Sequence, residues 1–262
     1  MIDLHIHSIY SDGTDTIEQI IDKAKSLNLS QIAITDHNTL EGSIIAHNNS
    51  SINSIIGTEL SVGYKGAEVH LLGYFPKGSD YKNVNFIIKE GEVNKKVAVL
   101  EMIENLNAMG FDLDVLELAK YSKGQINRVH ICMAMMDHGY IKSIDEGFQK
   151  YVGEHCEAYV ERKVTPLKEA AEAIHKDGGF AIIAHPYEYE DVGPIELFLQ
   201  DIINDIDGVE CFHPSATKEN SDFLVNFANK YNKKITGGSD YHGTNKPNIN
   251  LNQMNVEDIY RI

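Results

Sequence analysis

The stretch IDLHIHSIYSDG at residues 2–13 decides the fold of this chain. Its opening, IDLHI (2–6), is short and mostly aliphatic, which is typical of a buried strand in a parallel sheet. His5 and His7 stand at the end of this predicted strand, and the two-residue period of a strand sends both rings to the same face. Because two neighbouring imidazoles suit a divalent metal ion, the stretch predicts a strand that carries metal ligands at its carboxyl end.

Short apolar runs of the same kind recur along the chain, and helical patterns separate several of them. The runs are QIAIT (31–35), SIIG (54–57), FAIIA (180–184), GVECF (208–212) and KIT (234–236). Residues 16–27, 166–177 and 218–231 have the spacing of amphipathic helices. This alternation predicts an α/β fold with parallel strands, whose carboxyl ends face one common mouth in a barrel.

Residues 81–152 differ from the rest because they read only as helices, including 84–109 and 128–138. We therefore predict a mainly helical insertion over 81–152. The remaining residues, 1–80 and 153–262, are fewer than the about 250 of a usual (β/α)8 barrel. A smaller or incomplete barrel is expected for them.

Composition and charge narrow the class of protein. The 262 residues are 42% hydrophobic and 24% charged, as in ordinary globular proteins. No apolar run is long enough for a membrane span, and the N-terminus lacks the pattern of a signal peptide. A net charge of −16 disfavours long nucleic acids as partners. The three separated cysteines favour neither a disulfide framework nor a CxxC metal site, so a cytoplasmic location is expected.

A histidine or a carboxylate follows almost every predicted strand. The set comprises His5, His7, Asp12, Asp36, His37, Glu59, His70, His185, His213, Asp240 and His242. Imidazole-rich sites favour Mn, Zn or Fe over Ca or Mg. Because one zinc ion takes only about four ligands, the set predicts two or three divalent metal ions. Glu59 is the best candidate for a carboxylate that bridges two of them.

Several of these segments resemble, in the same order, the motifs of the polymerase and histidinol phosphatase (PHP) family. They are DLHIHSIYSDG (3–13), ITDHNT (34–39), GTE (57–59), HLLGY (70–74), AHP (184–186) and GGSDYHG (237–243). QINRVHI (125–131) and AYV (158–160) are similar to the helical insert of stand-alone bacterial members. The resemblance implies a metal-dependent phosphoesterase on a distorted (β/α)7 TIM-like barrel, with the insertion 81–152 covering the active site.

The resemblance also implies the metal ligands and the catalytic groups. The ligands of a first metal would be His5, His7, Glu59 and Asp240. Those of a second would be Glu59, His70 and His185, and those of a third Asp12, His37 and His242. A metal-bridging hydroxide would be the nucleophile, and the residues expected to take part in catalysis are Asp12, His37, His213 and Asp240. The SDG form of the Asp12 segment resembles nucleotide-directed members more than histidinol phosphatases.

Arg128 is the predicted partner of the substrate phosphate. It follows Asn127, a good N-cap, so it opens a helix whose N-terminus favours anions. His213 is expected to contact the phosphate as well or to protonate the leaving group. The lysine that often precedes AYV in the family's insert is absent from GEHCEAYV (153–160), which weakens the case for a bisphosphate substrate and leaves a monophosphate open.

The sequence thus predicts a cytoplasmic hydrolase of a small phosphorylated metabolite or nucleotide, with trimming of short oligonucleotides also open. Two alternatives remain. One is a non-catalytic metal-binding module, as some PHP domains of polymerases are. The other is an amidohydrolase-type deaminase, which also begins with HxH on a strand. The presence of Asp12, Glu59 and SDYH (239–242) fits a phosphoesterase better than a deaminase.

Overall fold

The computed structural model describes residues 1–262 except 50, 77, 122–125, 258–259 and 261. The chain divides into two compact units, a barrel unit of Met1–Ile88 with Thr165–Ile262, and a helical unit of Lys89–Val164. The helical unit and the predicted insertion 81–152 overlap over residues 89–152. Each unit has a hydrophobic core of its own.

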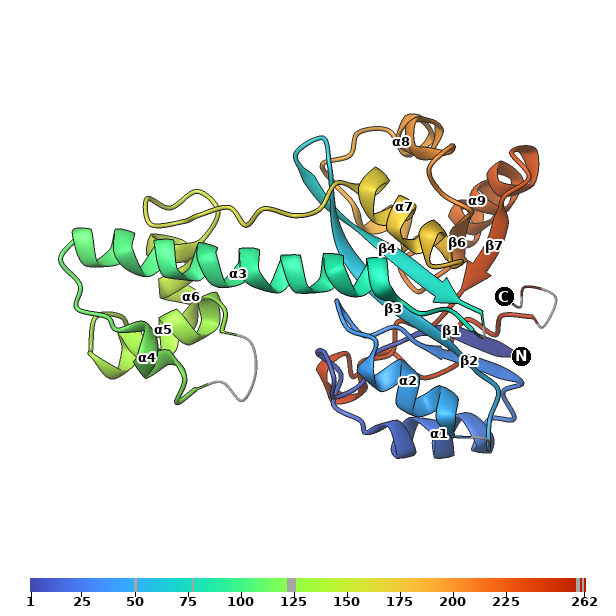
Figure 1. Cartoon of the computed structure of the whole chain (residues 1–262), viewed down its shortest axis with the longest axis horizontal. Helices are drawn as coiled ribbons and strands as arrows, with labels where there is room; N and C mark the ends of the chain where they lie inside the picture. Colours follow the sequence, from blue (N-terminus) through green and yellow to red (C-terminus); the bar gives the residue numbers. More distant parts are fainter. Residues whose placement is uncertain (50, 77, 122–125, 258–259, 261) are drawn as a thin grey trace. The chain divides into compact units, whose positions relative to one another are not determined.

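A seven-stranded sheet forms the barrel unit, with its strands in sequence order (Figure 1). The strands are β1 (Ile2–Ile6), β2 (Gln31–Ile34), β3 (Ser54–Tyr64), β4 (Ala67–Phe75), β5 (Phe180–Ile183), β6 (Gly208–Phe212) and β7 (Lys234–Gly237). Neighbouring strands are parallel except at β4, which runs antiparallel to both β3 and β5.

The antiparallel strand β4 corrects the expectation of parallel strands throughout. The sequence pattern indicated only the first residues of β3 and no strand over β4. The two strands form a hairpin around Lys65 and Gly66, whose φ angles of 47° and 92° are both positive. Such a two-residue turn matches the twist of the strands it joins, and glycine adopts it without steric cost.

Helices described within the barrel unit connect its strands. They are α1 (Ile17–Ser26), α2 (Glu41–Asn48), α7 (Leu167–Lys176), α8 (Ile195–Ile202) and α9 (Lys218–Lys230). Helix α1 begins with a capping box, in which the Thr16 side chain accepts from the Gln19 N–H and the Gln19 side chain accepts from the Thr16 N–H. Its buried residues, such as Ile17 and Ile20, pack in a core cluster that includes Ile6 of β1.

Backbone contacts between β1 and the end of β7 bring the barrel close to closure. The Asp240 N–H donates to the His5 carbonyl (2.9 Å), and the His7 N–H donates to the Tyr241 carbonyl (2.8 Å). Gly238 allows this approach, because a Cβ there would lie 2.4 Å from the Cβ of His5. The predicted TIM-like barrel is confirmed, and its closure sets the first histidine pair beside the last Asp-His pair.

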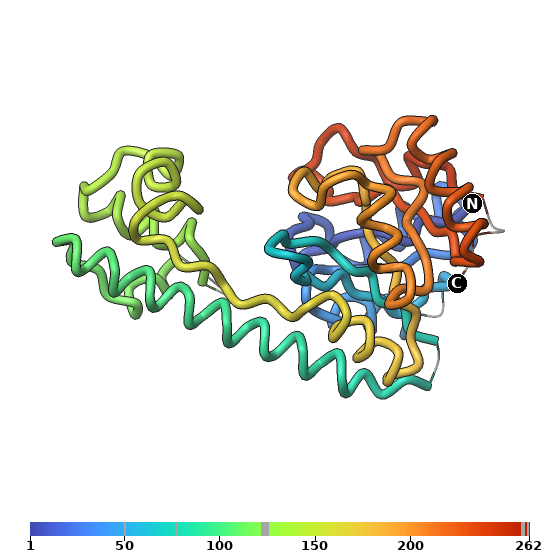
Figure 2. Tube along the Cα trace, turned by 90° about the horizontal axis from the view of Figure 1, so that it is seen from above, coloured from blue at the N-terminus to red at the C-terminus, as the bar shows by residue number. Residues whose placement is uncertain are grey.

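The helical unit packs short helices around part of α3 (Lys82–Ala108), which is continuous across the boundary between the units. It contains α4 (Val115–Leu118), α5 (Arg128–Asp137) and α6 (Ile144–Gly147), followed by a π-helical turn, Phe148–Val152. After the helical unit the chain returns to the barrel unit at α7. Both chain ends lie on the barrel unit (Figure 2). Among the described residues, no helix is both long and apolar enough to cross a membrane.

Asp177, at the end of α7, caps the start of α3. Its carboxylate accepts hydrogen bonds from the N–H of Val84 (2.8 Å) and from the N–H (3.1 Å) and side-chain amide (2.6 Å) of Asn83. We expect Asp177→Ala to lower the free energy of unfolding by about 1–2 kcal/mol, because the first N–H groups of the helix lose their acceptors. Urea denaturation checks this, with Asp177→Asn as the variant that keeps one acceptor oxygen. An unchanged midpoint in Asp177→Ala would contradict the capping role.

Candidate active site

His5 and His7 lie side by side at the end of β1, as the two-residue spacing predicts. Both side chains are fully buried, and their Nε2 atoms are 3.1 Å apart. Two buried ring nitrogens at this distance can share a proton or bind the same cation. Oδ1 of Asp240, after β7, lies 3.4 Å from Nε2 of His5 and 3.3 Å from Nε2 of His7. These three side chains form one candidate metal-binding group.

Glu59 on β3 is the centre of the site. Its carboxylate is 1% exposed, and its two oxygens face different histidines. Oε1 lies 3.0 Å from Nδ1 of His70 and 2.8 Å from Nε2 of His185. Oε2 lies 3.2 Å from Nε2 of His5, 3.1 Å from Nε2 of His7 and 3.3 Å from Nδ1 of His37. A carboxylate with ring nitrogens gathered at each oxygen has the arrangement of a bridging ligand.

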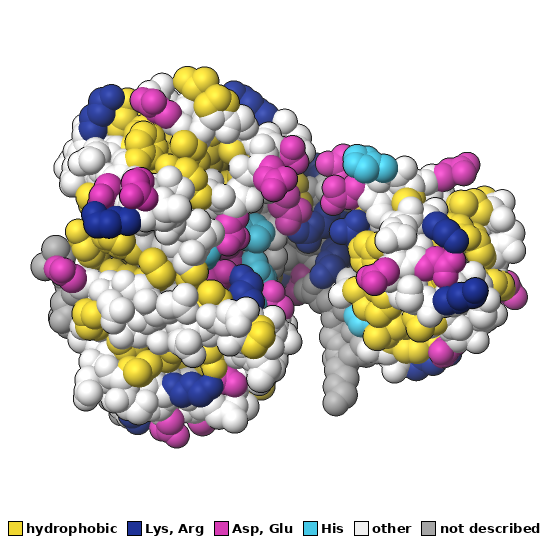
Figure 3. Space-filling model, turned by 180° about the vertical axis from the view of Figure 1, so that it is seen from behind, with side chains coloured by type: hydrophobic (Ala, Val, Ile, Leu, Met, Phe, Trp, Pro, Cys, Tyr) yellow, Lys and Arg dark blue, Asp and Glu magenta, His cyan; other side chains and the backbone are white. Residues whose placement is uncertain are grey.

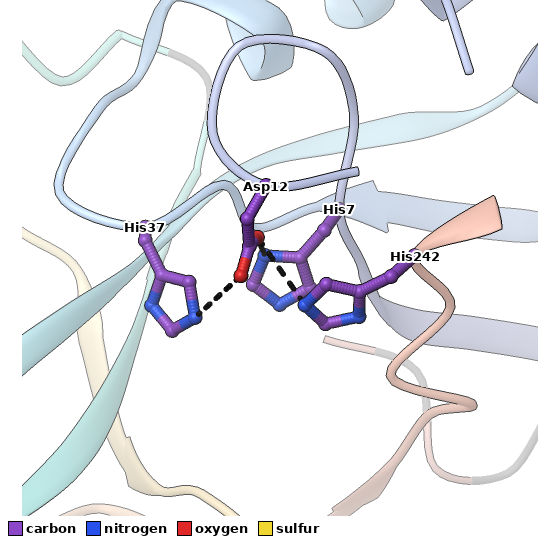
Figure 4. A group of neighbouring side chains, drawn as sticks. All are labelled: His7, Asp12, His37 and His242. Atoms are coloured by element: carbon purple, nitrogen blue, oxygen red, sulfur yellow. Dashed lines mark ion pairs between the residues drawn. The ribbon is translucent and has the colours of Figure 1, made fainter. Parts of the chain in front are cut away.

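Asp12, His37 and His242 form a further group with His7 at the rim of the site (Figure 4). Oδ1 of Asp12 lies 3.2 Å from Nε2 of His242 and 3.3 Å from Nδ1 of His7, and Oδ2 lies 3.8 Å from Nε2 of His37. The Asp12 side chain is 52% exposed, so this end of the cluster faces solvent. The structure thus brings together all nine residues predicted as metal ligands.

The charges of the cluster favour ionised carboxylates. Burial would raise the pKa of Glu59, but His37, His5 and His70 hold that pKa well below its usual value. Burial would also lower the pKa of His5, yet the carboxylates of Glu210, Glu59 and Asp240 raise it well above its usual value. Protons on such imidazoles balance the carboxylates in the metal-free protein, and divalent cations can replace them.

The donor set fits divalent metal ions. Within the described part of the chain, Nδ1 of His37, Nδ1 of His185 and Nε2 of His213 are buried ring nitrogens that make no hydrogen bond, although each lies within ion-pair distance of a carboxylate. Buried polar atoms without a hydrogen bond are uncommon in folded proteins. Imidazole nitrogens mixed with carboxylate oxygens are the ligands that Zn, Mn and Fe accept. The space-filling view shows histidine and acidic side chains gathered on the barrel unit (Figure 3).

Two buried carboxylates hold the candidate ligands in place. Asp36 accepts from the N–H and hydroxyl of Ser8 (both 2.7 Å) and from the Ser11 hydroxyl (2.7 Å), so it fastens the loop that carries Asp12. Glu210 accepts from Nδ1 of His5 (3.0 Å) through one oxygen and from the N–H of His185 (2.8 Å) through the other.

The role of Glu210 as a partner of His5 and His185 was not predicted from the sequence. The signal was present, because a glutamate in the middle of the apolar run GVECF (208–212) is expected to need a buried partner. Burial would raise the pKa of Glu210, but His5 beside it holds that pKa below its usual value. As an ionised carboxylate it only accepts hydrogen bonds, so Nδ1 of His5 donates to it, and Nε2 is the ring nitrogen at which a cation can replace the second proton.

Backbone strain accompanies two of the predicted ligands. His185, directly after β5, has a φ of 21°, and Asp240, after β7, has a φ of 54°. Such values are rare outside glycine and cluster at functional sites, where surrounding contacts maintain them. At His185 the maintaining contact is the hydrogen bond from its N–H to Glu210.

His213, predicted to act on the substrate, lies in the same cluster. It is 3% exposed, and its Nε2 lies 3.3 Å from Oδ2 of Asp240. Its Nδ1 lies 2.7 Å from the hydroxyl of Ser215 and 3.8 Å from Oε1 of Glu188. Glu188, His213 and Asp240 form another candidate metal-binding group, in which Glu188 was not foreseen.

Arg128 belongs to the helical unit, where it opens α5 after the N-cap Asn127. The Asn127 side chain accepts from the Val129 N–H (3.0 Å), as its N-cap position implies. The Arg128 guanidinium lies over the rings of Phe148 and Tyr159, 5.3 Å from each centroid. Its predicted contact with substrate phosphate remains a prediction.

Comparison with known proteins finds one domain family and several related enzymes. The model of the PHP domain matches residues 3–180. A 5'-3' exoribonuclease of Haemophilus influenzae is 27% identical over 92% of this chain and 89% of its own length. A 3',5'-nucleoside bisphosphate phosphatase of Chromobacterium violaceum is 28% identical over 92% of this chain and 87% of its own length.

A solved structure shares the fold. A candidate metal-dependent phosphoesterase from Bifidobacterium adolescentis superposes with a TM-score of 0.77 at 24% identity, covering 99% of this chain and 93% of its own. At this identity the likeness concerns the fold. The match covers residues of both units, so the elements of each unit have counterparts in that structure.

Proposed function

This chain belongs to the PHP domain family and is a metal-dependent phosphoesterase, and we propose that it hydrolyses small phosphate monoesters, with nucleotides as the preferred class. The arrangement of Glu59 carries the proposal, since each of its oxygens faces its own group of histidines. This supports a centre of two or three cations bridged by one carboxylate. The proposed ligands are His5, His7, Asp12, His37, Glu59, His70, His185, Asp240 and His242.

Divalent cations at such a centre polarise the phosphoryl oxygens and lower the pKa of water, which provides a nucleophile at neutral pH. The residues of the chain contribute position and proton transfer. Glu59 and Asp240 hold the ligand cluster at fixed geometry, and Asp12 completes it from the solvent side. His213 is proposed to deliver a proton from Nε2 to the leaving oxygen, because that atom makes no hydrogen bond and lies beside Asp240.

We also propose that the substrate is small. One relative is an exoribonuclease and another acts on nucleoside bisphosphates, so both nucleotides and ends of RNA are candidates. The net charge of −16 favours short substrates over long ones. Trimming of short RNA ends is therefore the second candidate activity.

A screen of phosphate release tests the proposal. Manganese-loaded protein is incubated with 4-nitrophenyl phosphate, nucleoside monophosphates and bisphosphates, cyclic phosphates, sugar phosphates and a short 5'-phosphorylated RNA. We expect phosphate from the nucleotides and the generic monoester. Release of nucleotides from the RNA without phosphate from the monoesters would favour the second candidate. No hydrolysis of any ester by fully metal-loaded protein would contradict both.

Glu210→Gln is expected to lower the affinity for manganese by about 10- to 100-fold, the usual effect of losing a partner of a ligating histidine. Nδ1 of His5 and the N–H of His185 face different oxygens of Glu210, and in glutamine one of these positions is an NH2 donor, so one of the two hydrogen bonds is lost. Calorimetric titration of the metal-free protein checks this, with the exposed Glu196→Gln on α8 as the matched control. Equal affinities in the two variants would show that Glu210 does not set the ligand geometry.

A further inference from the structure

The candidate site contains many carboxylates, which poses a problem for an anionic substrate. Asp12, Glu59 and Asp240 belong to the proposed ligand set, and Glu188 lies beside His213. A phosphate monoester brings further negative charge, so a cationic side chain near the metals is expected to assist its binding. Among the barrel residues that the structure describes, Lys246 is the one lysine or arginine that forms an ion pair with this cluster.

The position of Lys246 is fixed by the segment before it. Residues Gly243–Asn245 form a 3-10 turn directly after His242. The Thr244 N–H donates to the Thr14 hydroxyl (2.9 Å), and the Asn245 side-chain amide donates to the Asp12 carbonyl (2.7 Å). The segment is thereby fastened to the loop that carries Asp12, and Lys246 is held at the edge of the cluster.

The ammonium of Lys246 lies on one side of Asp240. Its Nζ is 2.5 Å from Oδ2, the oxygen that also lies 3.3 Å from Nε2 of His213. The other oxygen, Oδ1, faces His5 and His7, where a cation would bind. The side chain of Lys246 is 41% exposed, so its remaining two N–H donors are within reach of a molecule that enters from solvent.

We propose that Lys246 binds the phosphate group that is hydrolysed, as a direct contact to a phosphate monoester on the His213 side of Asp240. This rests on the proposed function. His5, His7 and Oδ1 of Asp240 would hold a cation, which would supply part of the positive charge that balances Asp240. The ammonium of Lys246 would then be able to turn to the phosphate oxygens.

Two variants and a control test the proposal. Lys246→Met removes the charge and keeps most of the aliphatic stem, whereas Lys246→Arg keeps the charge. Lys218→Met on α9 is the control, because the Lys218 side chain is 83% exposed and forms an ion pair with Asp222 on the same helix. The measurements on manganese-loaded protein are kcat/KM for 4-nitrophenyl phosphate, the inhibition constant of inorganic phosphate, and the manganese content.

We expect Lys246→Met to lower kcat/KM and to weaken inhibition by phosphate, each by about 10- to 100-fold, as for the loss of a charged hydrogen bond. Manganese content should remain that of the wild type. Lys246→Arg should retain most of both properties, and Lys218→Met should match the wild type.

The proposal is overturned if Lys246→Met keeps the wild-type inhibition constant for phosphate. It is also overturned if the variant loses manganese, because Lys246 would then position Asp240 rather than contact substrate. If the wild type hydrolyses no ester, the proposed function fails on its own. Calorimetry with inorganic phosphate and the manganese-loaded proteins then decides the role of Lys246, since binding to the wild type and Lys246→Met can still be compared.

Discussion

Glu59→Gln is expected to lower kcat by more than about 100-fold while the barrel stays folded. Changes outside the ligand shell of a metal cost about 10- to 100-fold, and Glu59 is proposed as a ligand that bridges two metals. The amide keeps the shape of the side chain, but it is neutral and has one oxygen, so it cannot serve the histidines on both sides. Phosphate release under saturating substrate, together with circular dichroism, checks the result.

The matched control for this variant is Glu41→Gln at the exposed start of α2, which is expected to keep wild-type activity. Manganese content separates the causes of a loss. A Glu59→Gln protein that binds less metal and has little activity agrees with a bridging role. A variant with full metal content and wild-type kcat would show that the carboxylate is not part of the reactive centre.

Removal of the metals is expected to abolish activity and to destabilise the barrel unit. Cations that bind only the folded state stabilise it by about 4 kcal/mol at a free concentration of 1,000 times Kd. For a chain of this size that corresponds to a rise in Tm of about 8–16 °C. The measurement is a thermal scan and an activity assay after chelation with EDTA, and again after manganese is restored.

Two further predictions concern the binding of manganese. Because the pKa values of His5 and His7 are raised, protons compete with cations, so manganese affinity should fall as the pH is lowered. Glu59→Gln should show a smaller rise in Tm with manganese than the wild type. Full activity in protein that retains almost no metal would contradict the metal-dependent mechanism.

The sequence allowed many of the candidate ligands to be predicted because they lie at or just after the end of a predicted strand. Parallel strands that end at one edge bring such residues together, so His5, His185 and Asp240 meet although they are distant in the chain. Glu59 and His70 differ, since they lie within β3 and the antiparallel strand β4. The family resemblance, confirmed by the match over residues 3–180, supplied the grouping around Glu59. The local pattern alone indicated ligands but not how they share cations.

Other features could not be read from the same pattern. The hairpin partner β4 depends on the positive φ angles of Lys65 and Gly66, a turn that the apolar runs used to predict strands do not indicate. The partners of Glu210 and the position of Lys246 depend on contacts that are made only when the barrel closes. Glu210 reaches His5 on β1, and the residue before Lys246 is held by the Asp12 loop. Such contacts join residues more than 200 positions apart, beyond what spacing indicates.

A crystal of the protein grown with excess manganese, measured for anomalous scattering, tests the central claim most directly. The account predicts at least two anomalous peaks within the cluster, with the Glu59 carboxylate between them and ring nitrogens of His5, His7, His70 and His185 at bonding distance. Histidine and carboxylate side chains that contact only one another, with no peak among them, would contradict it.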